Sequence, residues 1–284
     1  MVGLSEAQKA AWHRDGCLYP FPMLDGGEIQ ACLDGIARYE AFLGAPISAS
    51  EDLNCRTMPY LILPWAARIA RDPRILDVVE QLIGPDILIW TSTFFIKEPN
   101  SPTLAAWHQD ATYYGIEPAE PVTVWLALSD ASVEAGCMEV LPLGGEKRQM
   151  HHVAHVVENS VNRSAQVIVE PMDESTIEAM PLKAGSFSIH HGMTPHRSAP
   201  NTTAARRIGL GLNYIAPTVR PIGAHRTGAM LVRGEDRYGH FERVDGATAE
   251  LHPDARATHE RIVGLYRETY QEQEALHIAR FGGC

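Results

Sequence analysis

The segment Trp107-His-Gln-Asp110 places a histidine and an aspartate two positions apart. In an extended chain, residues i and i+2 point to the same side, so His108 and Asp110 can direct an imidazole and a carboxylate at one point. Together with a distant histidine, such a pair forms a facial triad that leaves open positions on a metal, as expected for a non-haem Fe(II) oxygenase. A lone His-x-Asp pair is more often a hydrogen-bonded surface pair, so the site requires a third ligand.

The chain contains thirteen histidines from which a third ligand can come. Three of them follow the turn Lys183-Ala-Gly185, which would lead into a barrel strand: His190, His191 and His196. We expect the others in solvated loops, helices or charged segments, where surface histidines are common. His196 is distinguished by its surroundings, because His196-Arg-Ser198 is followed by Arg207 at the start of a strand.

The segment Arg207–Tyr214 alternates in polarity as a strand does. Its apolar side chains fall on one face, and the opposite face carries Arg207, Gly209, Gly211 and Asn213. An arginine beside two glycines indicates a hollow that holds an anion at one end, because a guanidinium binds a carboxylate through two parallel hydrogen bonds. The alternative is a surface arginine with glycines at bulges, but the upstream His196 favours the hollow.

The elements that must position these residues are indicated by local patterns. Four helical segments are predicted from capping boxes, from a proline in a first turn and from apolar residues at helical spacing in the last part of the sequence. These are Ala7–Arg14 after Ser5, a segment from Asp25 to Gly44, a segment from Asp72 to Gly84, and Pro253–Phe281. Runs of β-branched and aromatic residues predict strands at Ile87–Lys97, Val122–Leu128, Met138–Leu141, Gln166–Val169, Ser186–His190 and Arg207–Ile215. Many short strands without long helices between them indicate an antiparallel barrel or jelly roll.

The chain is therefore expected to form one domain over residues 1–284, mainly β with flanking helices. We expect residues 1–85 to be mostly helical, 86–216 to form the jelly-roll core and 253–284 to form a C-terminal helix. Residues 217–252 carry arginines interleaved with acidic residues. Such a mixed segment is expected to be a solvated loop or a lid over the mouth of the barrel.

Composition limits the classes of function. The 284 residues are 45% hydrophobic, and 24 basic against 35 acidic residues give a net charge of −11, which argues against a nucleic-acid partner. No apolar stretch approaches the roughly 20 residues that span a bilayer, so we expect no membrane partner. Five scattered cysteines without a CxxC pair are typical of reduced thiols in a cytoplasmic protein. Nothing in the sequence indicates the oligomeric state.

A set of short motifs occurs in a characteristic order. These are His108-Gln-Asp110, Trp125-Leu-Ala-Leu-Ser-Asp130, Ala135-Gly-Cys-Met-Glu-Val-Leu-Pro142, Leu182-Lys-Ala-Gly185, His196-x-Ser198-x-x-Asn201 and Arg207. Together they closely resemble the phytanoyl-CoA dioxygenase family of Fe(II)/2-oxoglutarate oxygenases, over roughly Ser5 to Ala216. The sequence departs from the family pattern at Leu143-Gly-Gly-Glu146 and at Arg197, both expected beside the site rather than in it.

The resemblance implies a double-stranded β-helix, a cupin-like jelly roll. It implies that His108, Asp110 and His196 bind the iron and that Arg207 binds the distal carboxylate of 2-oxoglutarate. It also implies that Ser198 lies beside that carboxylate, and that the co-substrate pocket is lined by Trp125 and Thr93. The implied reaction consumes O2 and 2-oxoglutarate, releases succinate and carbon dioxide, and oxidises a small-molecule metabolite, with ascorbate as reductant in vitro.

Three other functions remain open at this point. A related halogenase would lack the metal carboxylate, and Asp110 is present. A zinc-dependent hydrolase can use two histidines and an aspartate with one water, but has no need of Arg207 in the cavity. A non-catalytic cupin-like binding module needs neither the His-Asp-His set nor Arg207. The net charge of −11 argues against an acyl-CoA substrate.

Overall fold

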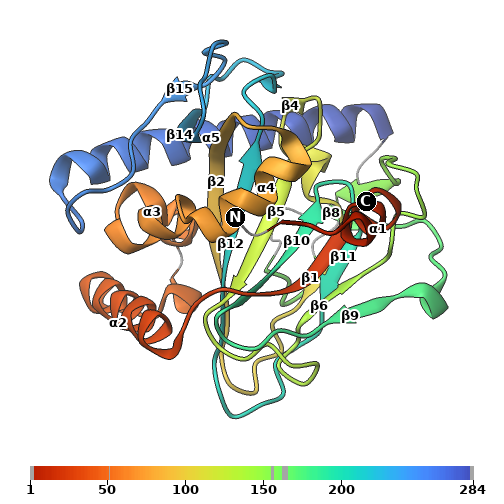
Figure 1. Ribbon diagram of the computed structural model, residues 1–284, viewed down its shortest axis with the longest axis horizontal. Helices are drawn as coiled ribbons and strands as arrows, with labels where there is room; N and C mark the ends of the chain where they lie inside the picture. Colours follow the sequence, from red (N-terminus) through yellow and green to blue (C-terminus); the bar gives the residue numbers. More distant parts are fainter. Residues whose placement is uncertain (1–2, 51, 155–156, 162–165, 282–284) are drawn as a thin grey trace.

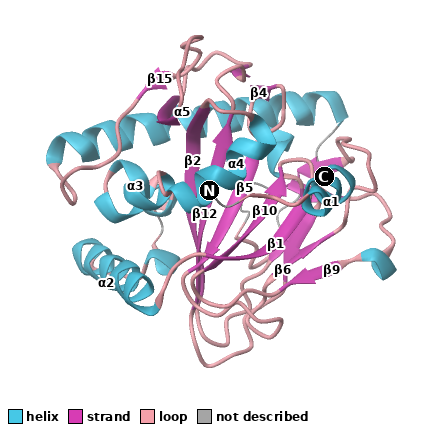
Figure 2. Ribbon diagram, viewed as in Figure 1, coloured by secondary structure: helices cyan, strands magenta, loops and turns pink. Residues whose placement is uncertain are grey.

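The computed structural model of the protein describes residues 3–50, 52–154, 157–161 and 166–281. Its α-helices are α1 (Glu6–Asp15), α2 (Gly26–Leu43), α3 (Pro64–Ala70), α4 (Pro73–Ile83) and α5 (Pro253–Phe281). Its short 3-10 helices are η1 (Ile47–Ala49), η2 (Leu53–Arg56), η3 (Pro59–Leu61), η4 (Asp110–Tyr113) and η5 (Glu174–Thr176). The helices lie at the flanks and the strands gather in the middle of the molecule (Figures 1 and 2).

The strands form two main sheets. The larger has seven strands in the order β1 (Cys17–Pro22), β10 (Ser186–His191), β5 (Val122–Ala127), β12 (Arg207–Ile215), β2 (Ile87–Lys97), β14 (Gly228–Arg233) and β15 (Glu242–Arg243). The smaller has four, in the order β3 (Ala105–His108), β11 (His196–Ser198), β6 (Met138–Val140) and β9 (Glu178–Met180). Two short pairs join β4 (Ile116–Glu117) to β13 (Arg220–Pro221) and β7 (His152–Ala154) to β8 (Gln166–Ile168). Apart from the β14–β15 pair the ladders are antiparallel, and the predicted double-stranded β-helix is confirmed.

The predicted helix starts are confirmed. Ser5 and Asp25 each close a capping box at the start of α1 and α2, and Asp72 caps α4 through its side chain. The helix α2 ends at Gly44, whose φ of 72° is a left-handed conformation that glycine adopts without steric cost. Within the described residues, no helix is both long enough and apolar enough to cross a membrane.

The main core lies between the larger sheet and the helices α2, α3 and α4 (Figure 1). The apolar face of β12 enters this core: Leu210, Leu212 and Tyr214 are fully buried. Tyr214 also donates a hydrogen bond of 3.0 Å to the carbonyl of Ala70 at the end of α3. The alternation predicted for β12 is therefore confirmed, and its polar face is turned away from this core.

Two segments differ from the sequence-based expectation. Residues 1–85, expected to be mostly helical, also contain β1, whose Pro20 and Pro22 weaken the strand signal; β1 lies at the edge of the sheet, where prolines are tolerated. The segment 217–252, expected to be a loop or lid, contributes β14, which pairs with β2. That strand was missed because its pairing depends on a register with a distant strand. The residues 282–284 of the expected C-terminal helix lie outside the described residues.

Candidate active site

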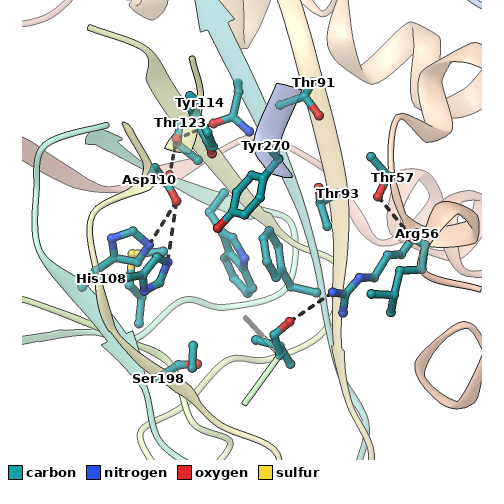
Figure 3. Close-up of a pocket in the computed structure, with 18 of the residues that line it drawn as sticks. Arg56, Thr57, Thr91, Thr93, His108, Asp110, Tyr114, Thr123, Ser198 and Tyr270 are labelled. Carbon is teal, nitrogen blue, oxygen red and sulfur yellow. Dashed lines mark hydrogen bonds and ion pairs between the residues drawn. The ribbon is translucent and has the colours of Figure 1, made fainter. Parts of the chain in front are cut away.

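A cavity of about 400 Å³ lies between the two sheets (Figure 3). The larger sheet contributes Thr93, Trp125 and Arg207 to its walls, and the smaller sheet contributes His108, His196 and Ser198. Asp110, at the first turn of η4, completes the set of seven residues singled out in the sequence. The fold thus brings all of them to one pocket.

The residues His108, Asp110 and His196 converge at the middle of this pocket. His108 ends β3 and is the direct register partner of His196 on β11. One ligand atom from each of the three residues lies within 4.8 Å of the others, which is the spacing that a single metal ion requires. The Oδ1 atom of Asp110 lies 3.7 Å from Nε2 of each imidazole. Gln109 is extended, with φ −118° and ψ 128°, so His108 and Asp110 point to the same side although η4 begins at Asp110.

The two imidazoles are oriented by backbone carbonyls. Nδ1–H of His108 donates 2.8 Å to the carbonyl of Ala106, and Nδ1–H of His196 donates 3.0 Å to that of Thr194. This tautomer leaves the Nε2 lone pair of each ring free and directed at the centre of the triad. Burial, and then the neighbouring His108, lower the pKa of His196 well below its usual value, so the ring is neutral as a metal ligand must be.

The other oxygen of Asp110 is held from behind. Thr123 Oγ1 donates 2.8 Å to Oδ2, and Nε2–H of His190 donates 3.2 Å to the same atom. The side-chain oxygen of Asn213 lies 2.6 Å from the Thr123 hydroxyl. Burial raises the pKa of Asp110, but the nearby His196 and the hydrogen bonds to histidines outweigh it and keep that pKa well below its usual range. Asp110 therefore presents a single oxygen, Oδ1, to the metal position.

The inner end of the pocket carries two buried cations. Lys97 on β2 and Arg207 on β12 are direct register partners, so their side chains lie on the same face of the sheet. Lys97 Nζ donates to Ser198 Oγ at 2.7 Å and also to the carbonyl of Ala199. Arg207 Nη1 donates 2.8 Å to the carbonyl of Gly136, and its guanidinium lies 4.9 Å from the centre of the Trp125 ring.

Both cations are destabilised by this environment. Burial, and then the charge of Arg207, lower the pKa of Lys97 to about 7. Burial lowers the pKa of Arg207 to about 10, and its Nε has no hydrogen-bond partner among the described residues. Two like charges opposite each other in a sheet repel, so this end of the pocket is built to receive an anion.

A known protein family matches most of the chain. The sequence profile of phytanoyl-CoA dioxygenase (PhyH) matches residues 12–209, which include all seven of the predicted site residues. The chain belongs to this family.

Several known proteins are similar to the chain in sequence or in structure. A probable alpha-ketoglutarate-dependent hypophosphite dioxygenase from Stutzerimonas stutzeri is 26% identical over 168 residues, or 58% of this chain and 57% of the relative. L-proline trans-4-hydroxylase from Streptomyces griseoviridis is 25% identical over 240 residues, or 75% of this chain and 87% of the relative. The structure of apo ThoJ, a non-heme monooxygenase, superimposes with a TM-score of 0.82 and 28% identity, covering 93% of this chain and 97% of ThoJ. The chain spans about half the length of the first curated relatives it matches, between 50% and 57%.

One expectation for the site of this family member was wrong. The glycines of β12 were expected to leave a hollow without side chains. Instead, a Cβ atom on Gly209 would lie 2.0 Å from the Trp125 ring, and one on Gly211 would lie 2.7 Å from Phe95. Aromatic rings from neighbouring strands occupy the space that the glycines leave, and these rings form the pocket wall.

Other residues had no clear sequence signal. Lys97 ends a strand that the sequence predicted correctly, but its pairing with Arg207 follows only from the register of β2 against β12. His152 and His259 were expected at the surface, yet both are buried. His259 donates 2.7 Å to the carbonyl of Thr57, and His152 accepts from the backbone N–H of Gln109 at 3.2 Å. Both are satisfied structural histidines rather than ligands.

Proposed function

We propose that the protein is a non-haem Fe(II)- and 2-oxoglutarate-dependent dioxygenase of a single domain, which oxidises a small-molecule metabolite with O2 and releases succinate and carbon dioxide. The observation that carries the proposal is the pair Lys97–Arg207 in the same pocket as the triad. A dicarboxylate that reaches from the metal to these cations is the ligand that such an arrangement requires.

The donor set supports iron as the metal. Two neutral imidazoles and one monodentate carboxylate are the ligands of the 2-His-1-carboxylate facial triad. His108, Asp110 and His196 would hold Fe(II), which supplies O2 activation coupled to oxidative decarboxylation of 2-oxoglutarate. Zinc suits the same donors, but a zinc hydrolase gives no reason for two buried cations at the far end of the pocket.

The remaining residues bind and orient the co-substrate. Arg207 and Lys97 bind its distal carboxylate, and the Ser198 hydroxyl, already bonded to Lys97, donates to the same group. The Trp125 ring stacks under the Arg207 guanidinium and excludes water from this ion pair. Thr93 lines the pocket on the neighbouring strand. A pocket that excludes water strengthens the electrostatic attraction between the carboxylate of 2-oxoglutarate and the two cations.

We also propose that the protein is located in the cytoplasm, which is a reducing compartment. The four described cysteines are free and buried, which supports the cytoplasmic location expected from the sequence; Cys284 lies outside the described residues. Two relatives support a small-molecule substrate, since one is named for hypophosphite and another for L-proline.

A succinate-release assay tests the proposed function. The protein is incubated with Fe(II), ascorbate, O2 and 2-oxoglutarate, alone and with a panel of metabolites. We expect slow succinate release without substrate and faster release with a substrate, both lost in the Asp110→Ala variant. Arg206→Ala is the matched control, because Arg206 pairs with Glu40 and Glu98 outside the pocket. Succinate release that persists in Asp110→Ala would contradict the assignment.

A further inference from the structure

The half of the pocket that faces away from Lys97 and Arg207 has a wall of its own. The helix α5 contributes Tyr266, Arg267, Tyr270, Gln271 and Glu274 to the pocket lining. Their positions follow the pattern i, i+1, i+4, i+5 and i+8, so they share one face of the helix. All of them lie beyond the residues 12–209 that match the family profile. The iron and 2-oxoglutarate contacts come from the matched residues, so this wall is available for the substrate.

The second wall comes from η2 and is joined to α5. Arg267 Nη1 donates 3.1 Å to the side-chain oxygen of Asn54 in η2. Two residues further along η2, Arg56 lines the pocket and donates from Nη2 to the carbonyl of Val161 at 3.0 Å. Figure 3 shows Arg56 extending into the pocket from the side opposite His108 and Asp110. These hydrogen bonds orient the guanidinium groups of Arg56 and Arg267, and both residues line the pocket.

Two tyrosines of α5 stand in the lining of the same pocket. Tyr266 lines the same pocket as Arg56 and Asp110. The hydroxyl of Tyr270 points toward the middle of the pocket (Figure 3).

The rest of the lining combines apolar residues, such as Leu53 and Val161, with polar ones. Thr57 and Thr91 present side chains to the same space as Tyr270 (Figure 3). Glu274 stands on the α5 face, but seven residues from Arg267, which is about 10 Å along the helix axis. Glu274 therefore does not lie beside Arg267 on the helix. A cavity of about 400 Å³ that also receives 2-oxoglutarate has room for a small molecule.

We propose that η2 and α5 form an oxyanion subsite in which Arg56 and Arg267 bind a carboxylate or phosphate of a small polar substrate while its reacting carbon lies at the triad. A guanidinium group binds a carboxylate and a phosphate in the same way, through parallel hydrogen bonds, so the subsite can recognise a substrate that carries either group. The inference rests on the proposed function, since it assigns the other half of the pocket to 2-oxoglutarate. The hydroxyls of Thr57, Thr91 and Tyr270 then serve the substrate's remaining polar atoms.

Binding to the metal-loaded protein tests the subsite without turnover. The protein is loaded with Ni(II) and 2-oxoglutarate and titrated calorimetrically with matched pairs of probes. One arm compares small hydroxy and amino carboxylic acids with their primary amides, and the other compares phosphate monoesters with the parent alcohols. We expect binding by members of one charged series and at least about tenfold weaker binding by their neutral partners.

The variants Arg56→Gln and Arg267→Gln should each weaken binding of the charged probe by about tenfold to a hundredfold, while 2-oxoglutarate affinity stays unchanged. Arg256→Gln is the matched control on the same helix, because its guanidinium lies over Phe42 and not in the pocket. Neutral probes that bind as well as charged ones, a panel without any charged binder, or full affinity in both variants would overturn the proposal. Failure of the proposed function would be seen separately, as absence of 2-oxoglutarate binding to the wild-type protein.

Discussion

Lys97 and Arg207 are direct cross-strand partners on adjacent strands, and neither of these buried cations forms an ion pair with a carboxylate of the described residues. Cross-strand pairs of like charge are destabilising. Each cation is held by neutral oxygen atoms, from Ser198 and Ala199 on one side and Gly136 on the other. Repulsion between Lys97 and Arg207 lowers the stability of the protein without a ligand. A bound anion between them would relieve this repulsion.

Removing Arg207 should weaken 2-oxoglutarate binding. Loss of a charge-assisted hydrogen bond to a desolvated carboxylate leaves the anion with only Lys97 and Ser198, so the apparent KM of Arg207→Ala should rise by about a hundredfold. Steady-state succinate release against 2-oxoglutarate concentration measures it. Arg206→Ala should leave that KM unchanged, because Arg206 pairs with Glu40 and Glu98. A raised KM in Arg206→Ala together with an unchanged KM in Arg207→Ala would mean that Arg206, and not Arg207, binds the co-substrate.

The affinity for 2-oxoglutarate should fall as the pH rises above 7. The pKa of Lys97 in the free protein is about 7, because of burial and then of the charge of Arg207. A bound carboxylate stabilises the charged amine and raises this pKa, so binding above pH 7 takes up a proton and costs affinity. Calorimetry in two buffers of different ionisation enthalpy measures the uptake. Lys97→Met should bind more weakly and without this pH dependence; a wild-type affinity that is flat to about pH 8 would refute the role of Lys97.

The hydroxyl of Thr123 should tune the metal site. It holds the Oδ2 atom of Asp110, which leaves Oδ1 as the ligand. Thr123→Val removes this hydrogen bond and should lower Fe(II) affinity by about tenfold or more. Thr123→Ser keeps the hydroxyl and should retain most of the affinity. Metal-competition titrations compare the variants, and equal affinities of the valine and serine variants would show that the hydrogen bond has no such role.

The close approach of Gly209 to Trp125 should make that position intolerant of a side chain. A Cβ atom there would lie 2.0 Å from the ring, so Gly209→Ala must displace Trp125 and should lower the free energy of unfolding by about 1–3 kcal/mol. Urea denaturation measures this change. Gly264→Ala, in α5 where nothing lies within 4 Å of a built Cβ, should instead stabilise the protein by about 0.5–1 kcal/mol. A neutral Gly209→Ala would mean that the ring can move freely.

The sequence predicted those features that depend on local spacing. His108 and Asp110 are two positions apart, β12 alternates, and the capping boxes at Ser5 and Asp25 lie within four residues. Each of these signals is contained in a short segment, so it can be recognised before the fold is known. The candidate metal site of His108, Asp110 and His196 was predicted from them with the addition of His196.

Features that depend on register between distant segments could not be predicted. The pairing of Lys97 with Arg207 requires β2 and β12 to align residue for residue. The ring that fills the space at Gly209 belongs to Trp125 on another strand, so a glycine was interpreted as a hollow. The contribution of Arg267 to the pocket depends on how α5 packs across the sheets. In each case the missing information is the tertiary arrangement, which residue types alone do not encode.

The most direct test of the account is an anaerobic visible spectrum of the protein with Fe(II) and 2-oxoglutarate together. A metal held by the triad and a co-substrate held by Lys97 and Arg207 share one pocket, so we predict a weak charge-transfer band that requires both. The band should be absent with Zn(II) and in His108→Ala, and should bleach with succinate release when O2 is admitted. A protein that binds Fe(II) but forms no band at any 2-oxoglutarate concentration would contradict the account.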